Sequence, residues 1–224
     1  MDFEALERSA LFKGFSVADL DVMLEQTPHR VQRYDKEEVV FKRGDVATWI
    51  GIVMEGRVQV EKTFPNGSRV NVSVRARGEM LGHAAAFSKA RRYPCDVIAL
   101  EKSSIVMIRR DDLLHLMQRD SRVLENFTTE IATATYMLQQ RIELLSYSGI
   151  AQKVAFWLLM ERRQHGRSVI PVPESVTRWA LLMNVSRPSL HRELRNMEAR
   201  GLIRYASHAV EILDMEGLQA LLNR

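Results

Sequence analysis

Apolar and polar residues alternate differently along three stretches of the chain. Between about residues 31 and 108, short runs rich in β-branched residues are separated by glycines. Residues 70–74 (Val-Asn-Val-Ser-Val) have the period of two that predicts a half-buried strand. Residues 65–67 (Pro-Asn-Gly), just before them, have the composition of a hairpin turn. Strands this closely spaced predict a roll or barrel, whose last strands we expect over 96–100 and 104–108.

Two further stretches have the periodicity of helices. A short helix is expected over 16–25, with Ser16 as N-cap and Asp19 at the third helical position. A long helix is expected over 121–147, where apolar residues recur every three or four positions as one seam. It is roughly 37 Å long at about 1.5 Å per residue, so it suits a two-chain coiled coil at least as well as packing on its own roll. The seam begins at Val123, and the positions that we assign to dimerisation are Phe127, Ile131, Ala134, Leu138, Ile142 and Leu145.

Residues 176–197 have the pattern of a helix–turn–helix. A first helix ends at Met183, a tight turn follows at 184–185, and Ser186 is a good N-cap for the second helix. Pro188 lies in the first turn of that helix, where its missing N–H is tolerated. The apolar face of the second helix consists of Leu190, Leu194 and Met197.

The opposite face of the second helix is polar and basic. Such a helix fits the DNA major groove, where arginine binds guanine O6 and N7 with two hydrogen bonds. Residues 150–224 carry 11 Lys+Arg against 7 Asp+Glu, whereas residues 1–149 carry 21 of each, so the net charge of +4 lies in the last third. This excess of positive charge favours a polyanionic partner. A hairpin is expected over 201–213, and a helix–turn–helix followed by a hairpin is a winged helix. The residues that we assign to DNA binding are Ser186, Arg187, Ser189, His191, Arg192 and Arg195.

Several classes of protein are excluded. A membrane span needs roughly 20 apolar residues, and the longest clean apolar run is 154–160. The N-terminus lacks the basic and apolar segments of a signal peptide. Cys95 is the one cysteine, which rules out an intrachain disulfide and a cysteine-only metal site within one chain, and we expect a cytoplasmic protein. No spacing of nucleophile, base and orienting residue indicates an enzyme.

The order and spacing of these motifs resemble the CRP/FNR family of bacterial transcription regulators. Five glycines (Gly44, Gly56, Gly67, Gly78 and Gly82) lie where the family's roll has them, and residues 78–82 are similar to its Gly-Asp/Glu-x-x-Gly signature. The resemblance implies an α+β fold in three parts. These are a cyclic-nucleotide-binding-like β roll that senses an effector over 1–120, a dimerisation helix over 121–148, and a winged helix–turn–helix DNA-binding domain over 149–224.

The resemblance also locates an effector pocket, where this chain departs from the family's pattern. Nucleotide-binding members follow the second glycine with a glutamate and carry Arg-Ser eleven residues later, whereas this chain has His83 and then Tyr93-Pro94. Proline has no N–H to donate and tyrosine brings no charge, so cyclic AMP is not the expected effector. The iron–sulfur site of oxygen-sensing members needs four cysteines. The pocket that we expect is lined by Glu79, Leu81, Gly82, His83, Tyr93, Thr135 and Met137.

Haem is the alternative effector group that the resemblance implies, because some relatives hold it between the roll and the long helix. His83 is then the candidate axial ligand, with Met80, Met107 or Met137 as a soft second ligand. The competing interpretation is a loop histidine and methionines that fill the core. The recognition helix is similar to that of regulators of the hybrid cluster protein (the HcpR group), which implies nitric oxide and nitrosative stress as the signal.

We therefore predict a homodimeric regulator that binds a palindromic operator in double-stranded DNA, with RNA polymerase as the implied partner. The best-known members read cytosine with a glutamate where this chain has Pro188, so base readout falls on Arg187, Ser189, His191 and Arg192. The alternative function is a cyclic-nucleotide-binding module that regulates a partner enzyme.

Overall fold

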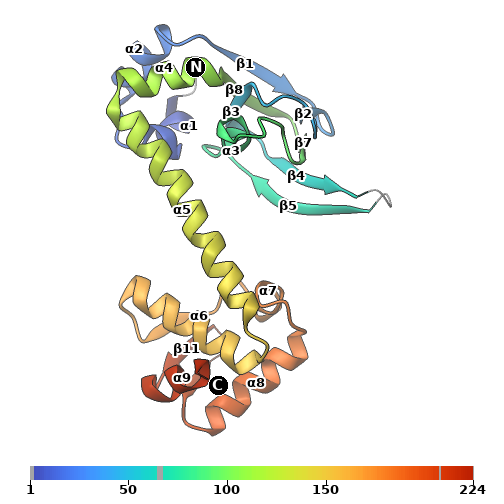
Figure 1. Ribbon diagram of the computed structural model, residues 1–224, viewed down its shortest axis with the longest axis vertical. Helices are drawn as coiled ribbons and strands as arrows, with labels where there is room; N and C mark the ends of the chain where they lie inside the picture. Colours follow the sequence, from blue (N-terminus) through green and yellow to red (C-terminus); the bar gives the residue numbers. More distant parts are fainter. Residues whose placement is uncertain (1–2, 65–67, 207, 224) are drawn as a thin grey trace. The chain divides into compact units, whose positions relative to one another are not determined.

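The computed structural model describes residues 3–64, 68–206 and 208–223, and the chain divides into two compact units. We call residues 1–134 the N-terminal unit and residues 135–224 the C-terminal unit (Figure 1). The boundary lies inside the long helix α5 (Ser121–Ser146), not at either of its ends. No helix in these described ranges is long and apolar enough to cross a membrane.

Two antiparallel four-stranded sheets form the N-terminal unit, with strand orders β1-β8-β3-β6 and β2-β7-β4-β5. Apart from the hairpin β4–β5, consecutive strands along the chain lie in different sheets, as expected of the predicted roll. The bounds are β1 (His29–Tyr34), β2 (Val39–Phe41), β3 (Trp49–Glu55), β4 (Val58–Thr63), β5 (Arg69–Arg75), β6 (Met80–Leu81), β7 (Asp96–Ala99) and β8 (Ser103–Arg109). The last two confirm the strands expected near 96–100 and 104–108.

Short helical segments accompany the strands of this unit: α1 (Phe3–Glu7), the 3₁₀ turn η1 (Ala10–Phe12), α2 (Val17–Glu25), α3 (His83–Phe87) and α4 (Arg110–Arg119). The predicted cap of α2 is confirmed, because the Asp19 N–H donates to Ser16 Oγ at 3.2 Å and the Ser16 N–H donates to Asp19 Oδ2 at 3.1 Å. Helices α1 and α3 were not expected, since five residues are too few for a helical period to show.

Strand β5 forms where it was expected, but its burial does not follow the alternation. Val70, Val72 and Val74 are 50%, 57% and 42% exposed. Strand β5 is the edge of its sheet, and the register with β4 shifts between Val60 and Glu61, which breaks the period of two. The prediction of a buried valine face is therefore wrong. The expected turn at 65–67, with Gly67, lies outside the described residues.

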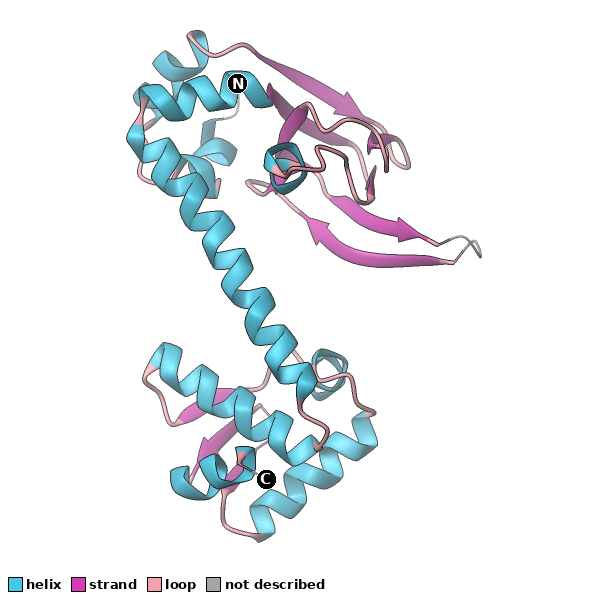
Figure 2. Ribbon diagram, in the orientation of Figure 1, coloured by secondary structure: helices cyan, strands magenta, loops and turns pink. Residues whose placement is uncertain are grey.

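The C-terminal unit consists of helices with three short strands among them (Figure 2). Its core includes Trp157 and Trp179, whose ring centroids lie 4.8 Å apart. Strand β9, which was not expected, ends at Pro171 on the edge of the sheet β10-β11-β9, a position where a missing N–H is tolerated. The bounds are α6 (Ile150–His165), β9 (Val169–Pro171), α7 (Val176–Leu182), α8 (Arg187–Ala199), β10 (Ile203–Ala206), β11 (Ala209–Ile212) and α9 (Met215–Leu222).

The apolar seam of α5 is divided between different environments. Val123 and Phe127 are 0% and 7% exposed in the core of the N-terminal unit, and Ile131 packs partly against that core. The ring of Phe127 lies 4.8 Å from that of Phe87. Phe127 therefore packs within its own chain, and its assignment to a dimer interface is corrected for that reason. Farther along, Ala134, Leu138, Ile142 and Leu145 are exposed.

Gly56 offers a direct test of the roll. Its φ is +79°, and a Cβ there would overlap the Lys102 carbonyl and Ser103 Oγ, whereas at Gly44, with φ +87°, a Cβ meets nothing within 4 Å. Left-handed backbone costs an alanine about 1–2 kcal/mol, and overlap in a packed site adds about 1–3 kcal/mol. Gly56→Ala is expected to lower the free energy of unfolding, measured in urea, clearly more than Gly44→Ala. Equal losses would contradict this packing.

Candidate nucleic-acid interface and effector site

The start of helix α8 is built as the sequence predicts. Asn184 adopts left-handed φ (+52°), and the Val185 N–H donates to the Ala180 carbonyl at 3.0 Å, which closes helix α7. Ser186 is the N-cap of α8, and its Oγ accepts from the Ser189 N–H at 3.2 Å. The cap and turn therefore determine where α8 begins and in which direction it leaves α7.

Burial of one face of α8 leaves the other face open to solvent. Leu190, Leu194 and Met197 are fully buried, which confirms the predicted apolar face. The exposed residues include Arg187, His191, Arg192 and Arg195. Ser189 is half-buried, and its hydroxyl accepts from Ser186 Oγ at 2.8 Å. The structure thus places the predicted DNA-binding residues on the first two turns and the middle of one helix.

Carboxylates divide the arginines of this region into two groups. Arg195 donates to Glu198 at 2.8 Å and lies over the Tyr205 ring, and Arg204 donates to Glu211 at 2.7 Å. The Tyr205 N–H and then the Arg195 side chain hold the pKa of Glu198 below its usual value. Among the described residues, no carboxylate is paired with Arg187 or Arg192. Two guanidinium groups near the start of α8 therefore keep their donors for another partner.

Two further exposed arginines belong to the same basic segment, although the sequence pattern did not single them out. Arg178 lies on α7, 3.9 Å from Glu174, and Arg200 is the C-cap of α8. The six arginines and absent lysines between residues 174 and 204 were the signal that could have included them. Arginines outside the base-reading positions commonly supply phosphate contacts that position a protein on DNA.

In the roll, the loop around β6 is stabilised by hydrogen bonds between its own polar groups. Gly78 and Gly82 have φ of +87° and +71° and lie on either side of β6. Glu79 accepts from Arg75 and from the Ala76 N–H, both at 2.8 Å, so its carboxylate braces the loop. Leu81 is buried in the core. Both oxygens of Glu79 are thus engaged within the loop, and Leu81 is part of the core.

Tyr93 fills the position at which the nucleotide-binding pattern requires Arg-Ser. Its ring stacks on Phe41 at 4.3 Å between centroids, and its hydroxyl donates to the Trp49 carbonyl at 2.7 Å. A Cβ on Gly82 would lie 2.9 Å from the Tyr93 ring, so the two residues are closely packed. Burial raises the pKa of Tyr93 to about 12, which keeps the phenol neutral. Tyr93 is therefore a core side chain and not the wall of an open pocket.

His83 is the first residue of α3, which corrects its interpretation as a loop histidine. Its ring lies edge-on to Phe127 at 6.4 Å between centroids, and its Nδ1 is buried without a hydrogen-bond partner. Burial, and to a smaller extent Arg75, lowers the pKa of His83 to about 4. The imidazole is therefore neutral at pH 7 and has an uncommitted nitrogen.

The other predicted pocket residues are not all in this unit. Thr135 and Met137 belong to the C-terminal unit, where Met137 is exposed. Met80 and Met107 are buried core residues of the roll. Across residues 3–64, 68–206 and 208–223, no three His, Cys, Asp or Glu side chains gather in a way that could hold a metal ion.

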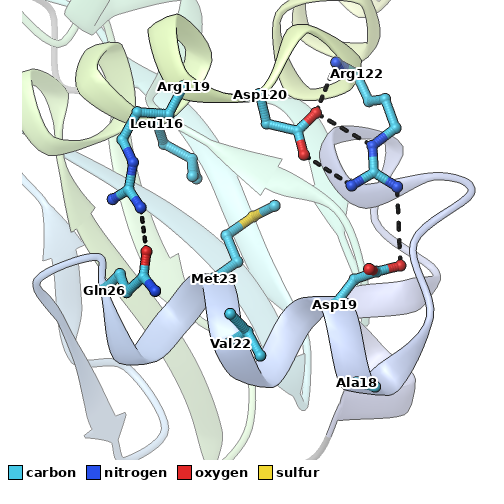
Figure 3. A pocket seen from close by; sticks show the side chains of 9 residues that line it. All are labelled: Ala18, Asp19, Val22, Met23, Gln26, Leu116, Arg119, Asp120 and Arg122. Atoms are coloured by element: carbon cyan, nitrogen blue, oxygen red, sulfur yellow. Dashed lines mark hydrogen bonds and ion pairs between the residues drawn. The ribbon is translucent and has the colours of Figure 1, made fainter.

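A different cavity lies between α2 and the end of α4 (Figure 3). It has a volume of about 400 Å³ and an apolar floor that includes Met23 and Leu116. Arg122 reaches Asp120 at 2.8 Å and Asp19 at 3.8 Å, and its guanidinium lies over the Phe15 ring. Because these charges offset one another, the cavity offers no net attraction for a charged ligand.

Comparison with known families gives two matches, in the order of the two units. Residues 31–120 match the cyclic nucleotide-binding domain, and residues 152–221 match the Crp-like helix-turn-helix domain. The first covers most of the roll, and the second covers α7, α8 and the three-stranded sheet.

Individual relatives align with this chain over nearly their whole length. The chain is 23% identical to a cyclic AMP receptor protein of Thermus thermophilus, over 96% of this chain and 98% of that one. It is 21% identical to a CRP-like cAMP-activated global transcriptional regulator of Mycobacterium tuberculosis, over 96% and 97%.

Solved structures show the same fold. The catabolite activator protein of Thermus thermophilus aligns with a TM-score of 0.56 and 23% identity, over 96% of this chain and 99% of that one. A variant of CooA from Carboxydothermus hydrogenoformans aligns with a TM-score of 0.55 and 16% identity, over 99% and 96%. The chain is thus similar along nearly its whole length to regulators of the CRP/FNR type, with a cyclic nucleotide-binding domain followed by a Crp-like helix-turn-helix domain.

Proposed function

We propose that the protein is a homodimer that binds a palindromic operator in double-stranded DNA and responds to a small effector other than cyclic AMP. The observation that carries the DNA-binding part is the exposed face of α8, where Arg187 and Arg192 have no carboxylate partner within the described chain. The N-terminal residues of a recognition helix contact base edges, and these arginines lie there. The match to a Crp-like helix-turn-helix domain also favours this function over a module that regulates a partner enzyme.

The exposed strip of α5 supports the dimer. Leu138 and Ile142 are 60% and 62% exposed, and Leu145 and Ala134 continue the strip in both directions. Large apolar side chains in a row at helical spacing are stabilised when a second helix covers them. A dimer also doubles the base pairs read, with two recognition helices about 34 Å apart on successive turns of DNA. RNA polymerase is the further partner that we propose from the resemblance to CRP-like transcription regulators.

The packing of Tyr93 supports an effector other than cyclic AMP. Two relatives are named for cyclic AMP, yet in this chain a neutral phenol stacked on Phe41 takes the place of the charged group that a cyclic phosphate needs. Pro94 supplies no N–H. Both changes remove interactions with an anion, so the effector binds by a different chemistry.

The state of the His83 side chain is compatible with haem as the effector group. The neutral imidazole of His83 has a buried Nδ1 without a hydrogen-bond partner, which is the state required of a metal ligand. When bound, haem iron supplies a coordination site for nitric oxide, consistent with a nitrosative-stress response. His83 contacts Phe127 of α5. Ligand binding at His83 would therefore change the packing of the long helix.

Loss of a guanidinium at the start of α8 is expected to weaken specific binding. The operator is first selected from a random duplex library, and affinities are then measured by fluorescence anisotropy. Arg187→Ala and Arg192→Ala are each expected to lose about 1–3 kcal/mol on the selected duplex. Arg195→Ala is the matched control and is expected to lose less, because Arg195 is bound to Glu198. Wild-type affinity of the first two variants would overturn the proposed interface.

Charge on the exposed strip of α5 is expected to separate the protomers. Leu138→Glu with Ile142→Glu places like charges in the proposed interface, so sedimentation should show a monomer and DNA affinity should fall. Gln139→Glu with Gln140→Glu adds charge to the same helix away from the strip and is expected to leave the dimer intact. A dimeric Leu138/Ile142 double variant would contradict the interface.

Ligand titrations separate the two effector classes. Calorimetry with cyclic AMP is expected to give no saturable heat. Haem added to the reduced protein is expected to give a Soret band that saturates at one haem per chain and shifts with nitric oxide. His83→Ala should abolish this band, while His115→Ala, an exposed histidine of α4, should not. A wild-type titration for His83→Ala would remove His83 as the ligand, and saturable cyclic AMP binding would overturn the exclusion of that effector.

A further inference from the structure

Two cationic side chains from different helices meet the carbonyl end of α7. Lys153 Nζ of α6 donates to the Met183 carbonyl at 3.1 Å, and the Arg141 guanidinium of α5 donates to the Leu182 carbonyl. Lys153 is only 8% exposed, and Arg141 is half-buried. The last carbonyls of a helix lack intrahelical donors and carry partial negative charge. Both cations therefore satisfy groups that would otherwise be left without a donor.

The contacts of these cations are with backbone and not with acids. In the part of the chain that the structure describes, neither Arg141 nor Lys153 is paired with a carboxylate. Burial, with a further contribution from Arg178, lowers the pKa of Arg141. A cation that loses water without gaining a counter-charge is costly to bury. The end of α7 is thus the group that stabilises both charges within the C-terminal unit.

These carbonyls lie immediately before the turn that orients the recognition helix. Asn184, with left-handed φ, follows Met183, and Ser186 then caps α8. No flexible linker separates the held carbonyls from the start of α8, because the Val185 N–H is bound to Ala180 within the same turn. A displacement of Leu182 is therefore passed to Arg187 within five residues.

Arg141 is also next to the exposed strip of α5. It precedes Ile142 and lies within one turn of Leu138 and Leu145, which are the residues we propose to be covered by a second α5. Arg141 therefore links the part of α5 that carries this strip to the end of α7.

We propose that Arg141 is a positioning residue: by donating to the last carbonyl of α7 it holds the turn from which α8 leaves, and so sets how α8 is presented to DNA. The inference rests on the proposed function, because it assigns a residue that positions the proposed recognition helix. Lys153 of α6 donates to the same helix end. Neither residue was singled out by the sequence.

The test compares full-length Arg141→Gln with Arg163→Gln, which removes an equal charge from an exposed site on α6. Each is titrated with the selected duplex and with a scrambled duplex at several salt concentrations. Arg141→Gln is expected to weaken binding to the selected duplex by about 3- to 30-fold. Its affinity for the scrambled duplex, its salt dependence and its dimeric state should equal those of the wild type. Arg163→Gln is expected to match the wild type on both duplexes.

A phosphate contact gives a different result. If Arg141 touched DNA directly, both duplexes would bind less well and the salt slope would fall by about 1, which would overturn the proposal. Wild-type affinity of Arg141→Gln for the selected duplex would overturn it equally.

Hydrogen exchange gives a second readout that needs no operator. The amides of residues 183–187 should exchange faster in Arg141→Gln than in the wild type, while those of β3 and β8 stay unchanged. Unchanged exchange at 183–187 overturns the proposal. If the wild-type protein selects no sequence from the library, the proposed function is wrong. The exchange of residues 183–187 can still be measured and still tests the role of Arg141. If Arg141→Gln does not fold, Arg141→Lys takes its place, with the same two changes expected in smaller degree because lysine reaches the carbonyl less well.

Discussion

Helix α5 contributes to two separate cores, and the other features of the molecule depend on that division. Its first turns place Val123 and Phe127 among the side chains of the roll, and its last turns place Leu144 in the core of the C-terminal unit. Since side-chain directions along a helix are set by a period of 3.6 residues, these two attachments determine which side chains between them stay outside. Leu138 and Ile142 are left exposed by this geometry.

Ion pairing, as well as exposure, determines which arginines of α8 are available to bind DNA. Arg187, Arg192 and Arg195 are all exposed, but Arg195 is bound to Glu198, whose second oxygen accepts the Tyr205 N–H. That network joins the end of α8 to β10 and keeps one cation for the fold. Exposed ion pairs contribute little to stability, so the main effect of this network is on where unpaired charge lies. The arginines of α8 left without a carboxylate partner within the described residues, Arg187 and Arg192, lie near the start of that helix.

The roll keeps the family's backbone and changes the chemistry inside it. Left-handed Gly78 and Gly82 hold the loop around β6, but the side chains beside it are a histidine and a stacked tyrosine. Each buried group is neutral at pH 7, His83 because burial lowers its pKa to about 4 and Tyr93 because burial raises its pKa to about 12. A neutral imidazole and a neutral phenol at these two positions bind a cyclic phosphate less well than charged donors would, and they suit an apolar or metal-containing group better.

The sequence by itself determined the elements whose signals are local. The Ser16 and Ser186 caps, the helix over 121–147, the buried face Leu190, Leu194 and Met197, and the order of roll and helix–turn–helix all follow from spacing and turn chemistry. Only the tertiary structure decided which positions of the α5 seam are buried, that the valines of β5 are exposed, that Tyr93 is packed against Phe41, and that Arg141 reaches α7. Tyr93 and Arg141 contact residues that are distant in the sequence, and the exposed side chains of β5 and α5 have no other element of the described chain packed over them. The local pattern of apolar and polar residues records neither kind of information.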